Sequence, residues 1–177
     1  MIDAQGYGKA LFELSQENQT EVQVRRQVQL VDDVLHQNPE YITLMDTPAL
    51  STREKCALLH AAFEKLDAML NNFLSILCEK RSFYRFHACA QAYYDAYDEA
   101  KNILRATAIT AVAMKQRQCK ALGEKLSELT GKNVELTNRI DPSVIGGVTL
   151  RYEGMQIDDS IRSRLDTLRR TLAETIV

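Results

Sequence analysis

The sequence predicts a mainly α-helical protein. We expect an N-terminal six-helix bundle over residues 1–105, followed by a small α/β C-terminal domain over residues 106–177 with a β-hairpin and a final helix. Two observations predict this. Apolar residues recur three or four positions apart through residues 1–105, which is helical spacing. Beyond them the pattern changes to short β-branched runs with period-two alternation, separated by turn residues.

The first helix is expected around Tyr7, Leu11 and Leu14, which recur at steps of four and three. Gly8 and Phe12 widen its apolar face beyond a single stripe. A face that wide on a terminal helix indicates burial from two sides.

The middle helices are delimited by proline and by capping residues. The second helix ends before Pro39, because proline disfavours helix in the residue that precedes it, and Pro39 can itself open a short third helix. Ser51 followed by Glu54 is a capping box that starts the fourth helix. The apolar stripes of the second, fourth and sixth helices are Val24, Val28, Val31 and Leu35; Cys56, Leu59, Phe63 and Leu66; and Phe86, Ala90, Tyr93, Tyr97 and Leu104.

The fifth helix, at Met69–Leu77, is apolar around most of its circumference. Such a helix is usually central to a bundle or lines a groove.

The second domain alternates strands and helices. A strand is expected at Ala106–Val112, a helix at Cys119–Leu129 ended by Gly131, and a strand at Val134–Ile140. A hairpin follows, with Glu153-Gly154 as its two-residue turn. The last helix carries its apolar stripe at Ile161, Leu165, Leu168 and Leu172.

Composition excludes several function classes. The formal net charge of −2 does not indicate a nucleic-acid binder. None of the four cysteines forms a CxxC pair, and the three histidines are far apart, so we expect buried thiols, no metal site, no cofactor and no catalytic site. No apolar run approaches the about 20 residues of a spanning helix, and no secretory signal is visible at the start.

The glycines and charges near the C-terminus have structural explanations. Gly146-Gly147 opens a predicted strand rather than joining a strand to a helix, so we expect a bulge or a close backbone approach rather than a phosphate site. Asp158 and Ser160 precede a helix and suit capping. The arginines of the last helix can pair with Asp166 along the helix, which favours a charged protein surface over an RNA site.

Two segments together resemble a known family. "YGKALFEL" at Tyr7–Leu14 resembles the first helix, and "IGGVTLRYEGMQIDDSIRSRLDTLRRTL" at Ile145–Leu172 resembles the C-terminal signature, of the F-type ATP synthase delta subunit, the family of the oligomycin sensitivity-conferring protein. Length and helix order agree over nearly the whole chain. Gly8 stands where alanine is usual in the family, which should loosen the first helix, and Asp159 stands where glycine is common.

The resemblance implies a non-catalytic peripheral-stalk subunit, held at the cytoplasmic face of the bacterial inner membrane only through the complex. The bundle would hold the N-terminal helix of a head alpha subunit in a groove between the first and fifth helices, and the C-terminal domain would meet the C-terminal ends of the b subunits. The expected groove residues are Tyr7, Ala10, Leu11, Leu14, Leu70, Phe73 and Leu77. The C-terminal family motif is carried by Gly146, Gly147, Asp158, Ser160, Arg164 and Leu165.

Two other functions are compatible with parts of the pattern. The helical half alone would also suit a free-standing adaptor that binds an amphipathic peptide helix. An RNA-binding protein that uses the arginine-rich helix would show salt-sensitive retention of RNA. The C-terminal signature favours the stalk subunit.

Overall fold

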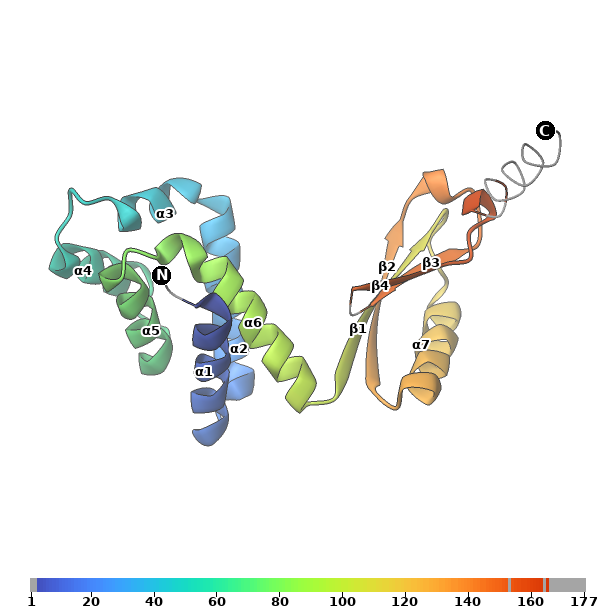
Figure 1. The fold of residues 1–177 in the computed structure, drawn as a ribbon, viewed down its shortest axis with the longest axis horizontal. Coiled ribbons are helices and arrows are strands. Elements are labelled where there is room, and N and C mark those ends of the chain that lie inside the picture. Colours follow the sequence, from blue (N-terminus) through green and yellow to red (C-terminus); the bar gives the residue numbers. More distant parts are fainter. Residues whose placement is uncertain (1–2, 153, 164, 166–177) are drawn as a thin grey trace, which may run out of the picture. The chain divides into compact units, whose positions relative to one another are not determined.

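The computed structural model describes residues 3–152, 154–163 and 165. The chain divides into two compact units, Met1–Ala100 and Lys101–Val177. Figure 1 shows helices in the first unit and a sheet with a covering helix in the second. The mainly α fold with a small C-terminal α/β part is confirmed.

The described residues of the first unit form six α-helices with short connections. Pro39 is the first residue of the third helix, as predicted, and the predicted capping box is present, with the Ser51 backbone N–H donating to Glu54 Oε2 at 2.8 Å. The helices are α1 (Ala4–Glu17), α2 (Glu21–Gln37), α3 (Pro39–Asp46), α4 (Thr52–Ala62), α5 (Ala68–Glu79) and α6 (Phe86–Ala100), with a short 3-10 helix at Phe83–Arg85.

The first and last helices of this unit pack closely against each other. Gly8 is buried on α1, and a Cβ atom at Gly8 would collide with the carbonyl oxygen of Cys89 on α6. The Phe12 ring meets Tyr93 and Tyr97 edge-on, with centroids 5.8 and 6.2 Å apart. The glycine that was expected to loosen α1 therefore allows α1 to reach the α6 backbone.

A buried polar contact links three helices of the bundle. The Ser15 hydroxyl donates to the Phe12 carbonyl and lies 3.1 Å from the Tyr93 hydroxyl, which donates to the carbonyl of Glu21. Burial raises the pKa of Tyr93 to about 12, so the ring stays neutral and keeps donating.

The described residues of the second unit form a four-stranded sheet with the helix α7 on one face. The strand order is β2-β1-β3-β4, with β1 and β2 parallel and the other pairs antiparallel. Its core lies between α7 and the sheet, around Ala106, Ala108, Leu126 and Leu150. The elements are β1 (Ile103–Thr110), α7 (Gln116–Thr130), β2 (Asn133–Ile140), a 3-10 helix (Pro142–Val144), β3 (Val148–Tyr152) and β4 (Met155–Asp158).

The first strand begins earlier than the sequence predicted. We expected Leu104 on the stripe of the sixth helix and the strand at Ala106–Val112, but α6 ends at Ala100 and β1 already starts at Ile103. Leu104 is 1% exposed, because its side chain belongs to the alternating buried set of the strand. The last helix starts at Ile161, and its predicted continuation through Leu168 and Leu172 lies outside the described residues.

Candidate functional site

Helix α1 carries two apolar stripes with different surroundings. The first faces α6 and is buried; it includes Leu11, which is 4% exposed. The second follows Tyr7, Ala10 and Leu14, of which Tyr7 is half-buried, Ala10 is exposed and Leu14 is 48% exposed. The residues of the expected groove on α1 are therefore split between core and surface.

The expected groove residues on α5 belong to the core. Leu70 and Leu77 are fully buried and Phe73 is 7% exposed. A residue without exposed surface offers nothing for a partner to contact in this conformation. The apolar residues that α5 does present are Ile76, which is 41% exposed, and the half-buried Met69.

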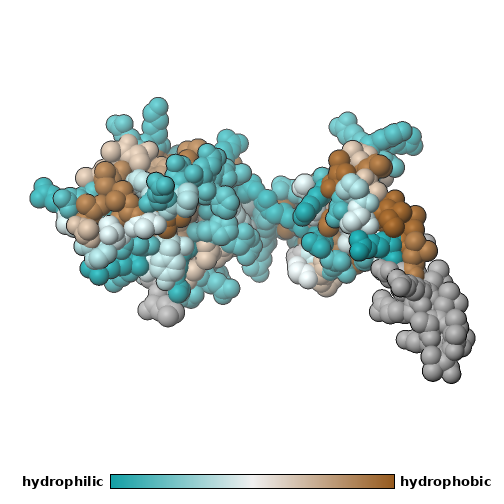
Figure 2. Space-filling view, turned by 90° about the horizontal axis from the view of Figure 1, so that it is seen from above, coloured by the Kyte–Doolittle hydropathy of each residue, from teal (hydrophilic) through white to brown (hydrophobic). Residues whose placement is uncertain are grey.

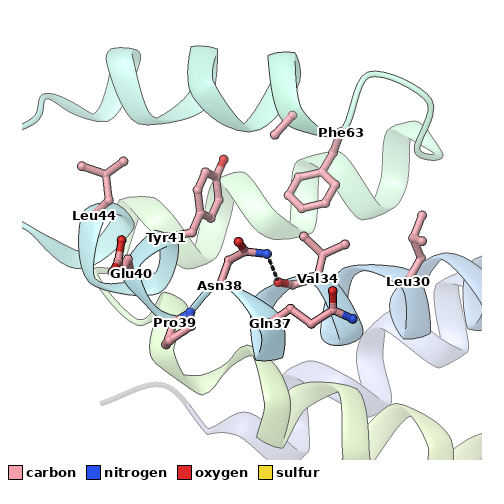
Figure 3. A pocket seen from close by; sticks show the side chains of 10 residues that line it. Leu30, Val34, Gln37, Asn38, Pro39, Glu40, Tyr41, Leu44 and Phe63 are labelled. Atoms are coloured by element: carbon pink, nitrogen blue, oxygen red, sulfur yellow. Dashed lines mark hydrogen bonds between the residues drawn. The ribbon is translucent and has the colours of Figure 1, made fainter.

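A concave apolar surface that the sequence did not predict lies on other helices of the first unit. Figure 3 shows this pocket between α2, α3 and the end of α4, with Leu30, Val34, Leu44 and Phe63 around it. Its volume is about 820 Å³. The Asn38 side-chain amide donates to the Val34 carbonyl and fixes the turn between α2 and α3 at its base.

The sequence contains a signal for this pocket that could have been used. Leu30 and Val34 stand four residues apart on α2 and are offset from the stripe Val24–Leu35 that fills the core. They remain 55% and 36% exposed. A second apolar stripe on a helix whose first stripe is already buried indicates an exposed binding face.

The glycine pair of the C-terminal motif permits a close backbone approach, as predicted. Gly147 has φ +80°, and a Cβ atom there would lie 2.5 Å from the Asp159 carbonyl oxygen. At Gly146 a Cβ atom would lie 2.9 Å from Ile161 Cδ1, and the Gly146 carbonyl accepts the Ile161 N–H at 3.0 Å. The pair therefore brings the start of the last helix against the start of β3.

Asp158 and Ser160 act as caps at this junction. The Asp158 Oδ1 atom accepts the Ser160 N–H and the Thr149 hydroxyl, each at 3.0 Å, and the Ser160 hydroxyl accepts the N–H of Ser163 at 3.2 Å. The hydrogen bonds from Ser160, and then that from Thr149, lower the pKa of Asp158 below its usual value. These motif residues shape the second unit. Leu165 is 52% exposed, whereas Arg164 lies outside the described residues.

A strained turn precedes the glycine pair. Ile145 has φ +67° and ψ −47°, and the Gly146 N–H donates to the Val144 carbonyl at 2.8 Å across it. Such a γ-turn is rare for a β-branched residue. The Ile145 side chain is 61% exposed. Figure 2 shows that hydrophobic residues reach the surface of both units.

The described part of the chain shows little that could carry chemistry. Its four cysteines are free thiols, of which Cys78 and Cys89 are buried, and burial raises their pKa values to about 12 and about 11. Among the described residues no group of three or more His, Cys, Asp or Glu side chains could hold a metal ion. Within the same residues no helix is long and apolar enough to span a membrane.

Comparison with known proteins gives a consistent result over both units. The family model "ATP synthase delta (OSCP) subunit" matches residues 4–172. The "ATP synthase subunit delta" of Lactobacillus johnsonii is 32% identical over 172 residues, covering 97% of this chain and 94% of the relative. That of Alkaliphilus metalliredigens is 34% identical over 175 residues, covering 98% and 97%.

The fold is also found in a solved structure. A chain of the Toxoplasma gondii mitochondrial ATP synthase hexamer matches with a TM-score of 0.73 at 20% identity, covering 98% of each chain. The similarity in sequence and the similarity in fold both extend across the helical unit and the sheet unit. The chain belongs to the ATP synthase delta (OSCP) subunit family.

Proposed function

We propose that this chain is a non-catalytic subunit of the peripheral stalk of an F-type ATP synthase. It links the catalytic head, through the N-terminus of an alpha subunit, to the C-terminal ends of the b subunits. It is attached to the membrane only through the complex, at the cytoplasmic face of a bacterial inner membrane. The observation that carries this proposal is the family match over residues 4–172, which spans both units rather than one.

The role is mechanical. Proton flow turns the rotor, and the head would turn with it unless it were held. A chain with one interface in each compact unit can hold the head, because two linked contacts raise the overall affinity without any new contact. Thus the function needs apolar surfaces for partner helices, which both units present.

We assign the head contact to the exposed stripe of α1, formed by Tyr7, Ala10 and Leu14. Its residues are three and four positions apart, which is the spacing at which one helix contacts another in a helix-in-groove interface. Ile76 of α5 also presents exposed apolar surface, whereas the buried Leu70 and Leu77 hold α5 in place.

The test is calorimetric titration of the full chain with a peptide of the first twenty or so residues of the cognate alpha subunit. We expect binding to the wild-type chain and a loss of about ten-fold or more for Ala10→Asp, because a buried unpaired carboxylate is costly. Ala10 is exposed, so the variant should keep its helical circular dichroism.

A matched variant distinguishes a wrong assignment of the binding site from a wrong assignment of the function. Leu30→Asp places the same charge at the pocket between α2 and α3, at a side chain that is 55% exposed. Loss of peptide binding in Leu30→Asp but not in Ala10→Asp would move the head contact to that pocket. Absence of binding by the folded wild-type chain would contradict the stalk function.

The free-standing adaptor is the second candidate, and the pocket between α2, α3 and α4 is the observation that favours it. An adaptor would be recovered from cell extracts without the subunits of an ATP synthase. A stalk subunit should co-purify with them.

A further inference from the structure

The pocket between α2, α3 and the end of α4 has the dimensions of a small-molecule site. Its volume of about 820 Å³ lies within the roughly 300–1,000 Å³ that small ligands occupy in proteins. Figure 3 shows α4 on one side and α2 and α3 on the other, with the turn at Asn38 between them. Because this turn closes the pocket at its base, the pocket suits a compact ligand better than a helix that lies along two others.

The walls of the pocket are apolar and aromatic. Leu30 and Leu44 remain 55% and 41% exposed at its sides. The rings of Tyr41 and Phe63 stand at 84° to each other with centroids 6.4 Å apart, which gives the pocket an aromatic corner. An apolar group that covered these side chains would remove their surface from water, which is favourable.

The charge of the pocket is negative. Glu40 is the one charged side chain among the described residues that line it, and it forms no ion pair with any described residue. The helix ends that meet here, α2 at Gln37 and α3 at Pro39, carry opposing partial charges of about −0.5 and about +0.5, so the full charge of Glu40 remains. Burial raises the pKa of Tyr41, so this phenol stays neutral. The pocket therefore complements a single positive charge.

Hydrogen-bond acceptors lie at the base of the pocket. The Asn38 side-chain nitrogen donates to the Val34 carbonyl at 2.8 Å. Figure 3 shows the side-chain oxygen of Asn38 directed toward the space between the Tyr41 and Phe63 rings. An amide oxygen and a carboxylate accept hydrogen bonds but do not donate them. Both match the N–H donors of an ammonium group.

We propose that this pocket binds a small organic cation, namely a primary amine with an apolar body. The apolar body lies against Leu30, Leu44 and the aromatic corner, and the ammonium group pairs with Glu40, with the Asn38 oxygen as a further acceptor. The site goes beyond the stalk function, because the head contact is assigned to another surface, the exposed stripe of α1.

The experiment titrates the full chain with three probes that share one apolar body: phenylbutylamine, phenylbutanol and phenylbutyrate. Binding is followed by the NMR shifts of the backbone amides. We expect the shifts to change around Leu30, Val34, Leu44 and Phe63. The amine should bind about five-fold more tightly than the alcohol, the scale of one exposed ion pair, and the acid should bind more weakly than both.

Three variants separate charge from apolar contact. Glu40→Gln should weaken the amine by about five-fold and leave the alcohol unchanged. Glu13→Gln removes an exposed carboxylate of α1 that does not line the pocket, and should bind all three probes like the wild type. Leu44→Ala should weaken all three probes alike, by about three-fold, because it removes apolar contact only. Unchanged far-ultraviolet circular dichroism shows that each variant is folded.

The outcomes distinguish the occupants. A preference for the amine that depends on Glu40 but not on Glu13 supports the site. Equal binding of the amine and the acid, shifts that lie away from the pocket, or no binding to the wild-type chain would overturn it. Displacement of the amine by the alpha-subunit peptide would make the pocket a peptide site and overturn the ligand assignment. The proposed function would then stand, with its head contact moved to this pocket.

Discussion

At the scale of single residues, two glycines decide where backbone segments meet, one in each unit. Gly8 lets α1 reach the carbonyl of Cys89, and Gly147 lets the junction at Asp159 press against the start of β3. In the first case only the missing Cβ matters. In the second, a positive φ adds to the steric requirement.

We expect Gly147→Ala to destabilise the second unit by about 3 kcal/mol or more, because the left-handed backbone and the collision with the Asp159 carbonyl both oppose the methyl group. Gly131→Ala is the matched control. Gly131 also has a positive φ, but a Cβ atom there meets nothing within 4 Å, so a loss of about 1 kcal/mol is expected. Urea unfolding combined with amide exchange of β1 and β3 measures both. Equal losses would show that the close approach contributes nothing.

Gly8→Ala should cost the first unit about 2–3 kcal/mol, since the α6 backbone must move to admit the methyl group. Gly6→Ala on the same helix is the comparison, because its Cβ would meet only the Asp3 carboxylate, an exposed side chain that can turn away. Because that carboxylate also accepts the Gln5 N–H and caps α1, the change should cost at most about 1 kcal/mol in the same denaturation experiment, less than Gly8→Ala. A neutral Gly8→Ala would argue against tight packing between α1 and α6.

At the scale of elements, helix ends are fixed by local hydrogen bonds, and helix faces by packing. The box between Ser51 and Glu54 starts α4 where the sequence predicted it. The faces are less local: α1 and α2 each carry one stripe in the core and a second, displaced stripe that stays exposed. Helix caps can therefore be predicted from the sequence more readily than the division of apolar residues between core and surface.

The box also predicts a pH dependence. The hydrogen bonds from the Ser51 hydroxyl and then its backbone N–H lower the pKa of Glu54 below its usual 4.5. A carboxylate whose pKa is lowered by folding stabilises the folded state above the unfolded pKa, and this contribution disappears as the pH falls through the folded value. The wild type should therefore be more stable than Glu54→Gln near neutral pH, and the difference should shrink below pH 4.5. Thermal melts between pH 7 and pH 3 test this, and a difference that is constant with pH would contradict it.

At the scale of the whole molecule, the two compact units match two partners in the proposed stalk. The family match crosses the boundary at Ala100 without interruption. Linking the two sites in one chain makes the second binding event intramolecular.

Breaking the head contact should therefore weaken retention on the complex by roughly a hundred-fold or more. We expect Ala10→Asp to dissociate faster than the wild type from immobilised head plus a C-terminal fragment of the b subunit (the b fragment). Surface plasmon resonance with the head alone, the b fragment alone and both together measures this. If Ala10→Asp dissociated from both partners together at the wild-type rate, the two sites would not be acting jointly.

Much of the architecture was legible in the sequence. The order of the helices, the break at Pro39, the hairpin between β3 and β4 and the caps at Ser51 and Ser160 follow from short-range rules about periodicity, proline and hydrogen-bonding side chains. The family resemblance rested on segments from both ends of the chain, and the full-length match agrees with it.

Other features depended on contacts between distant residues. Periodicity marked Leu11, Leu70 and Phe73 as apolar, but whether a neighbouring helix or a partner covers them depends on packing, and in this fold they are core. The start of β1 is a second example. Leu104 fits the helical stripe of α6, but it lies in β1 because this strand pairs with β2. The second apolar stripe of α2 signals the pocket beside that helix, but the concave shape of the pocket arises only where α2 meets α3 and α4. An apolar pattern predicts that a face will be covered, whereas contacts between residues distant in the sequence determine what covers it.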